Sequence, residues 1–330
     1  MTRNDVKTGV SAAASWAWGT SLILGMQIAQ QKGLGAWGIW AAANTLALAF
    51  FGLLTRHGLL GRHVFDRPWI KVMALLIQCF CLVIQMNIIF VVLKDMGISE
   101  TEAYLSAVAV GWVFTLAMYR HGLAASIRTD CWQWAVVMIA VVLIIGMGAA
   151  ERAPCLAFPP SSRGDLLWAA WSACILLSGP IGDVQHWQRA EAAGGGPAFY
   201  WGSVFFGLYM LLVLVMARFS FTRGMHVILL FAVLAVTSST IDSIAVAMHE
   251  IGSRKAGTLL ALGLCTFWGV FAQMGVIELW SRAGAYRVAF ALLILGLAMA
   301  AKRRDGRDVR QKRADRRRSA SEHASWRLAG

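Results

Sequence analysis

Charged residues are scarce in this chain of 330 residues. Lys, Arg, Asp and Glu make up 14% of it, whereas soluble domains carry about a quarter. Proline is also rare, with 6 residues, while hydrophobic residues reach 58% and tryptophan 15 residues. This composition excludes an ordinary soluble enzyme and is typical of apolar helices that end in aromatic belts. We therefore expect an all-α polytopic membrane protein.

Acidic residues are outnumbered, with 17 Asp and Glu against 30 Lys and Arg, and the net charge is +13. Such a charge can indicate nucleic-acid binding, but eleven of the basic residues lie between Lys302 and Arg327, directly after the last apolar run. The positive-inside rule predicts a basic cytoplasmic tail over 302–330, which we expect to be disordered. Contact of this tail with anionic lipid headgroups is the alternative. Membrane lipid and a small polar solute are the expected partners, not nucleic acid.

The six cysteines have neither a disulfide nor a zinc spacing, because only Cys155 lies outside the apolar runs. A catalytic set of His, Asp, Glu or Cys at one membrane face is not visible either. We therefore expect no enzymatic activity and no organic cofactor.

Ten apolar stretches are joined by short loops. They cover residues 9–31, 36–56, 69–93, 103–119, 124–149, 165–188, 198–217, 226–250, 256–275 and 284–301. With a cytoplasmic N-terminus, 22 basic residues fall on the inner side and 8 on the outer side, Arg282 and Arg287 among the latter. Both termini are then expected in the cytoplasm, and the protein in the cell (inner) membrane.

Ten spans divide into two halves of five, which an odd number per half places in opposite orientations. We expect one transport core over 1–301, with the repeats at about 9–149 and 165–301. The first span of each half carries helix-breaking residues. Gly19 and Gly25 interrupt one; Ser178, Gly179, Pro180 and Gly182 interrupt the other. At membrane depth such breaks are tolerated beside a cavity or ligand, and a packing kink without a ligand is the alternative.

Three carboxylates, Asp130, Asp183 and Asp242, lie within spans, where a charge often marks an ion path. Asp242 is accompanied by five hydroxyls in the same stretch: Thr237, Ser238, Ser239, Thr240 and Ser243. Hard oxygens of this kind suit a small alkali cation. Alternatively, the hydroxyls bond their own helix or a neighbouring one.

Four short sequences resemble the sodium:solute symporter family. GLAASIRTDCWQ (122–133) is similar to its Thr-Asp-x-x-Gln signature, DVQHWQRA to its Gln-Arg motif, AVTSSTIDS to its Ser-Thr-x-x-Ser sodium motif, and AASWAWGTSLILG to its broken first helix. They fall on spans 5, 6, 8 and 1, as in the family's LeuT-type core. The resemblance implies such a core, although family members usually carry additional helices.

The resemblance also implies site residues. A sodium site would use carbonyls of Ala14 and Ala17 with hydroxyls of Ser238 and Ser239, or of Ser239 and Thr240 in the other register. Asp130 matches the family's aspartate linked to cation coupling, and Asp242 is added from its own residues. Gln188 and Arg189 match the Gln-Arg pair, as gate or structural residues with Gly19, Gly179 and Pro180. Trp16 replaces a small polar or acidic residue of relatives.

The sequence around Gln185, His186 and Trp187 is most similar to the urea/polyamine branch. Solute contacts are expected from the helix breaks and the helix facing them: Trp18, Thr20, Gln27, Gln78, Gln85 and Ser178. For each of these the alternative is a helix-packing contact. Trp69, Trp168, Trp201 and Trp280 lie near span ends and are expected in the interfacial belt.

These observations predict a cation-coupled symporter that moves a small polar solute, such as urea or an amine, by alternating access. Na+ is the expected coupling ion and H+ the alternative. A different class is a transporter-derived membrane sensor or regulatory module without net transport, which the low helix count favours.

Overall fold

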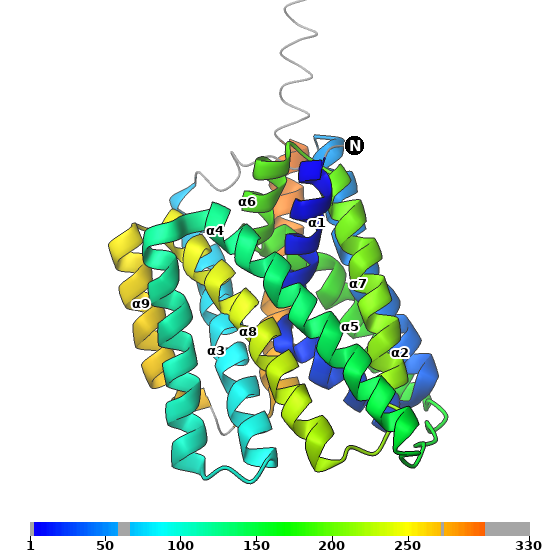
Figure 1. Ribbon diagram of the computed structural model, residues 1–330. Coiled ribbons are helices and arrows are strands. Elements are labelled where there is room, and N and C mark those ends of the chain that lie inside the picture. The colour runs from blue at the N-terminus through cyan, green and yellow to red at the C-terminus, as the bar shows by residue number, and fades with distance from the viewer. Residues whose placement is uncertain (1–2, 59–66, 272–273, 301–330) are drawn as a thin grey trace, which may run out of the picture.

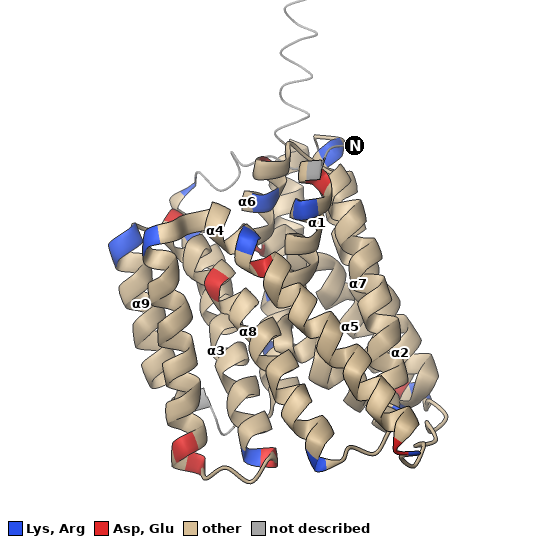
Figure 2. Cartoon of the chain, in the orientation of Figure 1, with Lys and Arg blue, Asp and Glu red and all other residues tan. Residues whose placement is uncertain are grey.

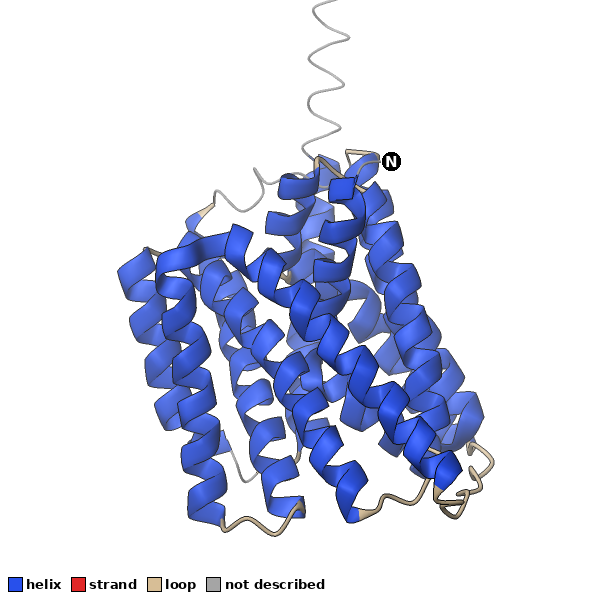
Figure 3. Cartoon of the chain, in the orientation of Figure 1, coloured by secondary structure: helices blue, strands red, loops and turns tan. Residues whose placement is uncertain are grey.

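The computed structural model describes residues 3–58, 67–271 and 274–300 (Figure 1). Helices dominate these ranges (Figure 3), and their one extended pairing is an isolated bridge between Cys155 and Phe219. The helices are α1 Arg3–Trp16, α2 Trp18–Arg56, α3 Pro68–Asp95, α4 Glu100–Ala150, α5 Arg163–Gly182, α6 Val184–Ala193, α7 Pro197–Met216, α8 Arg223–Ile251 and α9 Arg254–Phe267. A 3₁₀ turn over Trp268–Phe271 and a last helix over Val276–Ala300 complete the described fold. The predicted tail, 302–330, lies outside the described residues.

Seven of these helices are long and apolar enough to cross a membrane: α2, α3, α4, α5, α7, α8 and the last helix. Large apolar side chains also face outward from them, with Trp132 73% exposed and Leu167 63% exposed. A water-soluble protein rarely exposes so many, whereas lipid accommodates them. The chain is an all-α, multi-pass membrane protein, as its composition predicts.

Two of the long helices turn back on themselves at a glycine. In α2 the turn is at Gly33, with φ of 79°, and in α4 at Gly122, with φ of 63°. A straight α4 would be about 77 Å long, more than twice the hydrocarbon thickness of about 30 Å. In Figure 1, α4 runs along the molecule, bends at the end where α6 lies and descends along α8. Each of the two legs of α4 is long enough for one crossing.

With these turns, each of the ten predicted apolar stretches corresponds to a helical segment. The last one was predicted too short, since its helix begins at Val276 and not at residue 284. Glu278 and Arg282 in its first turns pair with each other at 2.5 Å and had lowered the apparent hydropathy there.

Helix α8 forms the centre of the molecule. Every residue from 235 to 248 is buried, which requires neighbours on all sides of the helix. The surrounding helices approach closely at glycines. A Cβ at Gly9 of α1 would lie 2.7 Å from the Ala198 carbonyl oxygen of α7, and one at Gly52 of α2 would lie 2.9 Å from that of Gly196. Charged residues of the ribbon gather mainly at its two ends (Figure 2).

Candidate functional site

The first and sixth apolar stretches are both interrupted. Helix α1 ends at Trp16, and α2 begins at Trp18, whose φ of 29° lies outside the helical region. Helix α5 ends at Gly182, and Asp183 has extended φ and ψ of −104° and 110° before α6 begins. The predicted positions were wrong by a few residues, because Gly19 and Gly25 lie within α2 and Ser178, Gly179, Pro180 and Gly182 within α5.

Side chains satisfy the backbone at both breaks. The Gly19 N–H, at the start of α2, donates to Gln85 Oε1 of α3 at 3.1 Å. At the other break, the Gln185 N–H donates to Asp183 Oδ1 at 3.2 Å, so that Asp183 caps α6. Both free helix ends are thus stabilised by polar side chains inside the protein.

Gly179 allows α5 to lie against the first break. A Cβ at this position would lie 2.4 Å from Cη2 of Trp16, the last residue of α1. Trp16 cannot easily move away, because its indole N–H donates to the Asn44 carbonyl oxygen at 2.9 Å and its ring packs edge-on to His186. The predicted structural role of Gly179 therefore has a steric basis.

We expect Gly179→Ala to destabilise the protein by about 1–3 kcal/mol, the usual cost of overpacking a core. The measurement is the thermal unfolding midpoint of the detergent-purified protein. Gly146→Ala in α4 is the matched control, since nothing lies within 4 Å of a Cβ there. That control should keep or slightly raise the midpoint, and equal midpoints for the two variants would contradict the steric role.

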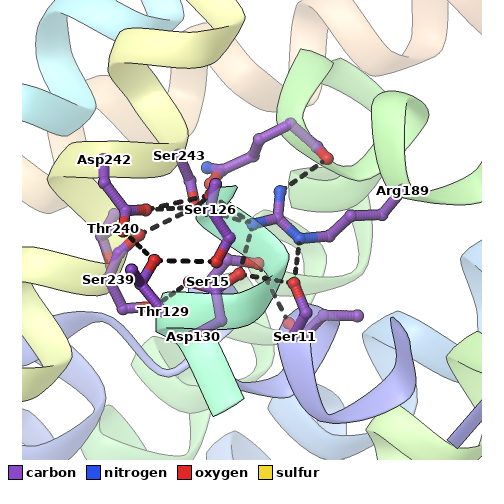
Figure 4. Close-up of polar contacts among 12 residues, drawn as sticks. Ser11, Ser15, Ser126, Thr129, Asp130, Arg189, Ser239, Thr240, Asp242 and Ser243 are labelled. Carbon is purple, nitrogen blue, oxygen red and sulfur yellow. Dashed lines mark hydrogen bonds and ion pairs between the residues drawn. The ribbon is translucent and has the colours of Figure 1, made fainter. Parts of the chain in front are cut away.

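Four helices contribute to a buried polar group, which we call the Arg189 cluster (Figure 4). Its members are Ser11 of α1; Ser126, Thr129 and Asp130 of α4; Arg189 of α6; and Ser239, Asp242 and Ser243 of α8. Arg189 Nη2 lies 2.6 Å from Asp130 Oδ2 and 2.7 Å from Ser243 Oγ, and its Nε donates to Ser11 Oγ at 2.8 Å. The arginine thus joins α6 to α1, α4 and α8.

The two carboxylates of the cluster have different partners. Asp130 accepts hydrogen bonds from Ser11 and from Ser239 Oγ, the latter at 2.6 Å, in addition to its ion pair with Arg189. Asp242 accepts hydrogen bonds from three hydroxyls: Ser126 Oγ at 3.1 Å, Thr129 Oγ1 at 2.8 Å and Ser243 Oγ at 3.1 Å. Among the described residues, no ion pair joins Asp242 to a basic side chain. The cluster carries two carboxylates and one guanidinium, one formal negative charge in excess.

The structure brings some predicted cation ligands together and separates others. Asp130, Ser239 and Asp242 meet in the Arg189 cluster. Ser238 donates to the Ala235 carbonyl oxygen and accepts from Gln133 Nε2, both at 3.0 Å, and Thr240 donates to the Val236 carbonyl oxygen. Ala14 is buried near the end of α1, and Ala17 is buried at the break between α1 and α2. Gln188, the neighbour of Arg189, donates to Glu250 at 2.6 Å.

A second polar group surrounds Asp183. Its Oδ1 accepts from Gln78 Nε2 of α3 at 2.9 Å, and its Oδ2 accepts from Gln185 Nε2 at 2.7 Å and from Arg287 Nη2 at 3.3 Å. Arg287 belongs to the last helix and also lies over the Trp18 ring, 4.4 Å from its centroid. Arg287 was counted among the basic residues of the outer side, and that count was wrong: the residue is 4% exposed, inside the helix Val276–Ala300.

A narrow cavity, which we call the tryptophan cavity, lies beside the first break and Arg287. Its lining residues are Trp16, Trp18, Thr20, Ser21, Leu24, Trp40, Asn44, Leu176, Trp280 and Arg287. The space open to a water-sized molecule is about 10 Å³, the room of roughly one water. Trp280 is 4% exposed here, so its predicted place in the interfacial belt was wrong, whereas Trp69 is 43% exposed.

The predicted solute contacts have four different placements. Trp18 and Thr20 line the tryptophan cavity. Gln85 accepts a hydrogen bond from Gly19 at the first break, and Gln78 donates one to Asp183 at the second. Ser178 donates to its own helix at the Ile175 carbonyl oxygen, and Gln27 lines a separate pocket of about 330 Å³ between α2, α3 and α8.

Sequence reasoning missed Trp40, Asn44 and Arg287, and it named Asp183 as a carboxylate within a span without placing it in a site. A basic residue within an apolar run was the available signal for Arg287.

Comparisons with known proteins give little further guidance. No family model matches the chain, and no curated protein matches it. Among solved structures, it is similar to the crystal structure of a manganese transporter from Eremococcus coleocola, at 10% sequence identity and a TM-score of 0.44, over 89% of this chain and 76% of that one. The resemblance to sodium:solute symporters therefore stays a prediction.

Proposed function

We propose that this protein is a secondary active transporter that moves a small polar solute together with a monovalent cation. The observation that carries the proposal is the meeting of both interrupted helices at one buried cavity. Trp16 and Trp18 flank the first break and line the cavity, while Asp183 at the second break pairs with Arg287, which also lines it. Non-helical backbone at membrane depth is a feature of transporter binding sites.

Coupling to a cation follows from the excess charge of the Arg189 cluster. An uncompensated carboxylate is costly in a buried site, so a cation bound near Asp242 would balance the charge. Residues of α1, α4, α6 and α8 form the cluster, and a cation bound there would favour the arrangement in which these helices are together. Na+ is the ion that the resemblance of AVTSSTIDS implies, and H+ is the alternative.

The transport cycle would follow the symmetry predicted from the sequence. Two five-helix repeats in opposite orientation, each beginning with an interrupted helix, would rock against each other around the cavity. With about 10 Å³ of free space, the described conformation is closed at the cavity. We place both termini in the cytoplasm, from the distribution of basic residues.

Uptake into proteoliposomes tests this function. Radiolabelled urea, acetate and methylamine represent neutral, anionic and cationic small polar solutes, and inward Na+ and H+ gradients are imposed separately. We expect at least one solute to accumulate under one gradient, and an ionophore that dissipates the gradient to abolish the accumulation. The proposal fails if none of the three enters faster than into protein-free liposomes.

Ser239→Ala is expected to raise the cation concentration for half-maximal uptake by about tenfold or more. The substitution removes a hydrogen bond to buried Asp130, and bonds to charged groups contribute about 1.5–3 kcal/mol. The cation concentration for half-maximal uptake is the measured quantity. Ser203→Ala is the matched control, since this α7 serine donates to the Thr45 carbonyl oxygen away from the cluster. An unchanged half-maximal concentration in Ser239→Ala would exclude this serine from coupling.

A further inference from the structure

The tryptophan cavity is lined by buried polar atoms that have no hydrogen-bond partner in the part of the chain that the structure describes. Trp18 Nε1, Trp40 Nε1 and Arg287 Nε are unpaired donors, and Asn44 Oδ1 is an unpaired acceptor. All four side chains are more than nine-tenths buried. Unpaired groups of this kind are costly in a protein interior and are retained where a ligand satisfies them.

The carboxylate of Asp183, which pairs with Arg287, already accepts its full number of hydrogen bonds. Both oxygens of Asp183 accept hydrogen bonds, from Gln78, from the backbone and side chain of Gln185, and from Arg287. No oxygen of this carboxylate is left for a solute cation. Arg287, by contrast, uses Nη2 toward Asp183 and Cys81, and its Nε–H has no partner.

The aromatic face that could hold a cationic solute is also occupied. The Arg287 guanidinium lies 4.4 Å from the centroid of the Trp18 ring, in the geometry of a cation–π contact. A second cation at this face would meet the guanidinium directly. The unpaired groups that the cavity offers to a solute are therefore mainly hydrogen-bond donors, with Asn44 Oδ1 as the acceptor among them.

We propose that Arg287, with the indole N–H groups of Trp18 and Trp40, binds a trigonal oxygen of the solute, either an amide-type carbonyl or a carboxylate. This inference rests on the proposed function and narrows its solute class. Arg287 presents a fixed planar fork, which suits a planar oxygen acceptor. Asp183 neutralises the guanidinium, so a neutral carbonyl solute can bind without leaving an unpaired charge. Cationic solutes such as amines are excluded from the site.

Binding to the detergent-purified full chain tests the inference without transport. Isothermal titration calorimetry with acetamide, acetate and methylammonium distinguishes a neutral carbonyl, a carboxylate and a cation, with chloride salts as ionic-strength controls. We expect acetamide or acetate to bind and methylammonium not to bind. Binding of methylammonium, or of none of the three probes, would overturn the proposal.

Two variants connect binding to the named groups. Arg287→Lys keeps a cation beside Asp183 but loses the Nε–H, and Trp40→Phe keeps an aromatic ring but loses the indole N–H. Each is expected to weaken binding by roughly tenfold or more, as loss of a hydrogen bond in a buried site does. Arg282→Lys is the control, because this arginine of the same helix pairs with Glu278 at the exposed surface. Circular dichroism verifies that each variant is folded.

The outcomes separate this inference from the proposed function. Uptake of a solute that is equally efficient in Arg287→Lys would leave the transporter proposal standing and overturn the role of Arg287. Arg287-dependent binding of acetamide or acetate without uptake under either gradient would support the site and contradict transport.

Discussion

Arg189→Ala is expected to cost about 3–5 kcal/mol of folding free energy, among the largest losses for any single substitution of a polar residue here. Alanine would leave Asp130 as a buried carboxylate whose remaining partners are the hydroxyls of Ser11 and Ser239. It would also remove the contacts of α6 with α1 and α8 in the cluster. The measurement is the unfolding free energy of the purified protein in mixed micelles, from denaturant titration.

A double substitution separates the charge from the packing. Arg189→Met with Asp130→Leu removes both members of the pair and should recover a large part of the loss, since buried pairs are often replaceable by apolar residues. Arg282→Ala, at the exposed Glu278 pair, should change stability little. A double variant as unstable as the sum of the two singles would indicate that the pair is not coupled.

The ten apolar stretches were predictable because hydrophobic runs are local in sequence. The interruption of spans 1 and 6 was also predictable, but its exact position was not. Side chains from other helices set it: Gln85 of α3 satisfies the Gly19 N–H, and Gln78 of α3 donates to Asp183. Local helix-breaking residues such as Gly25 stay helical where packing supports them.

The site was predictable in part for the same reason. The sequence motifs identified Asp130, Arg189 and Ser239 as separate site residues. Their meeting in one cluster depends on how α4, α6 and α8 pack, which the motifs do not show. Arg287 could not be assigned to Asp183 from the sequence, because the two residues are 104 positions apart and belong to different helices. It was counted among the basic residues of the outer side although it falls within the apolar stretch predicted over 284–301.

Asp183→Ala is expected to destabilise the protein by about 3–5 kcal/mol, because it removes the acceptor shared by the second break. It would leave the buried guanidinium of Arg287 without its counter-charge, free Gln78 and Gln185, and remove the N-cap of α6. Asp183→Asn should lie between alanine and wild type, since asparagine also caps helices but carries no charge. Unfolding free energies of the three proteins measure this order.

The double variant Asp183→Asn with Arg287→Gln decides whether the loss is electrostatic. It removes both charges and keeps amide groups at both positions. If the stability that Asp183→Asn loses comes from the unpaired guanidinium of Arg287, the double variant should be more stable than Asp183→Asn alone. Asp165→Asn is the matched control, because this aspartate belongs to the capping box with Ser162 at the opposite, exposed end of α5 and pairs there with Lys32 at 2.9 Å. Additive losses in the double variant would show that the charges of Asp183 and Arg287 are not coupled, and the charge balance at the tryptophan cavity would then not depend on Asp183.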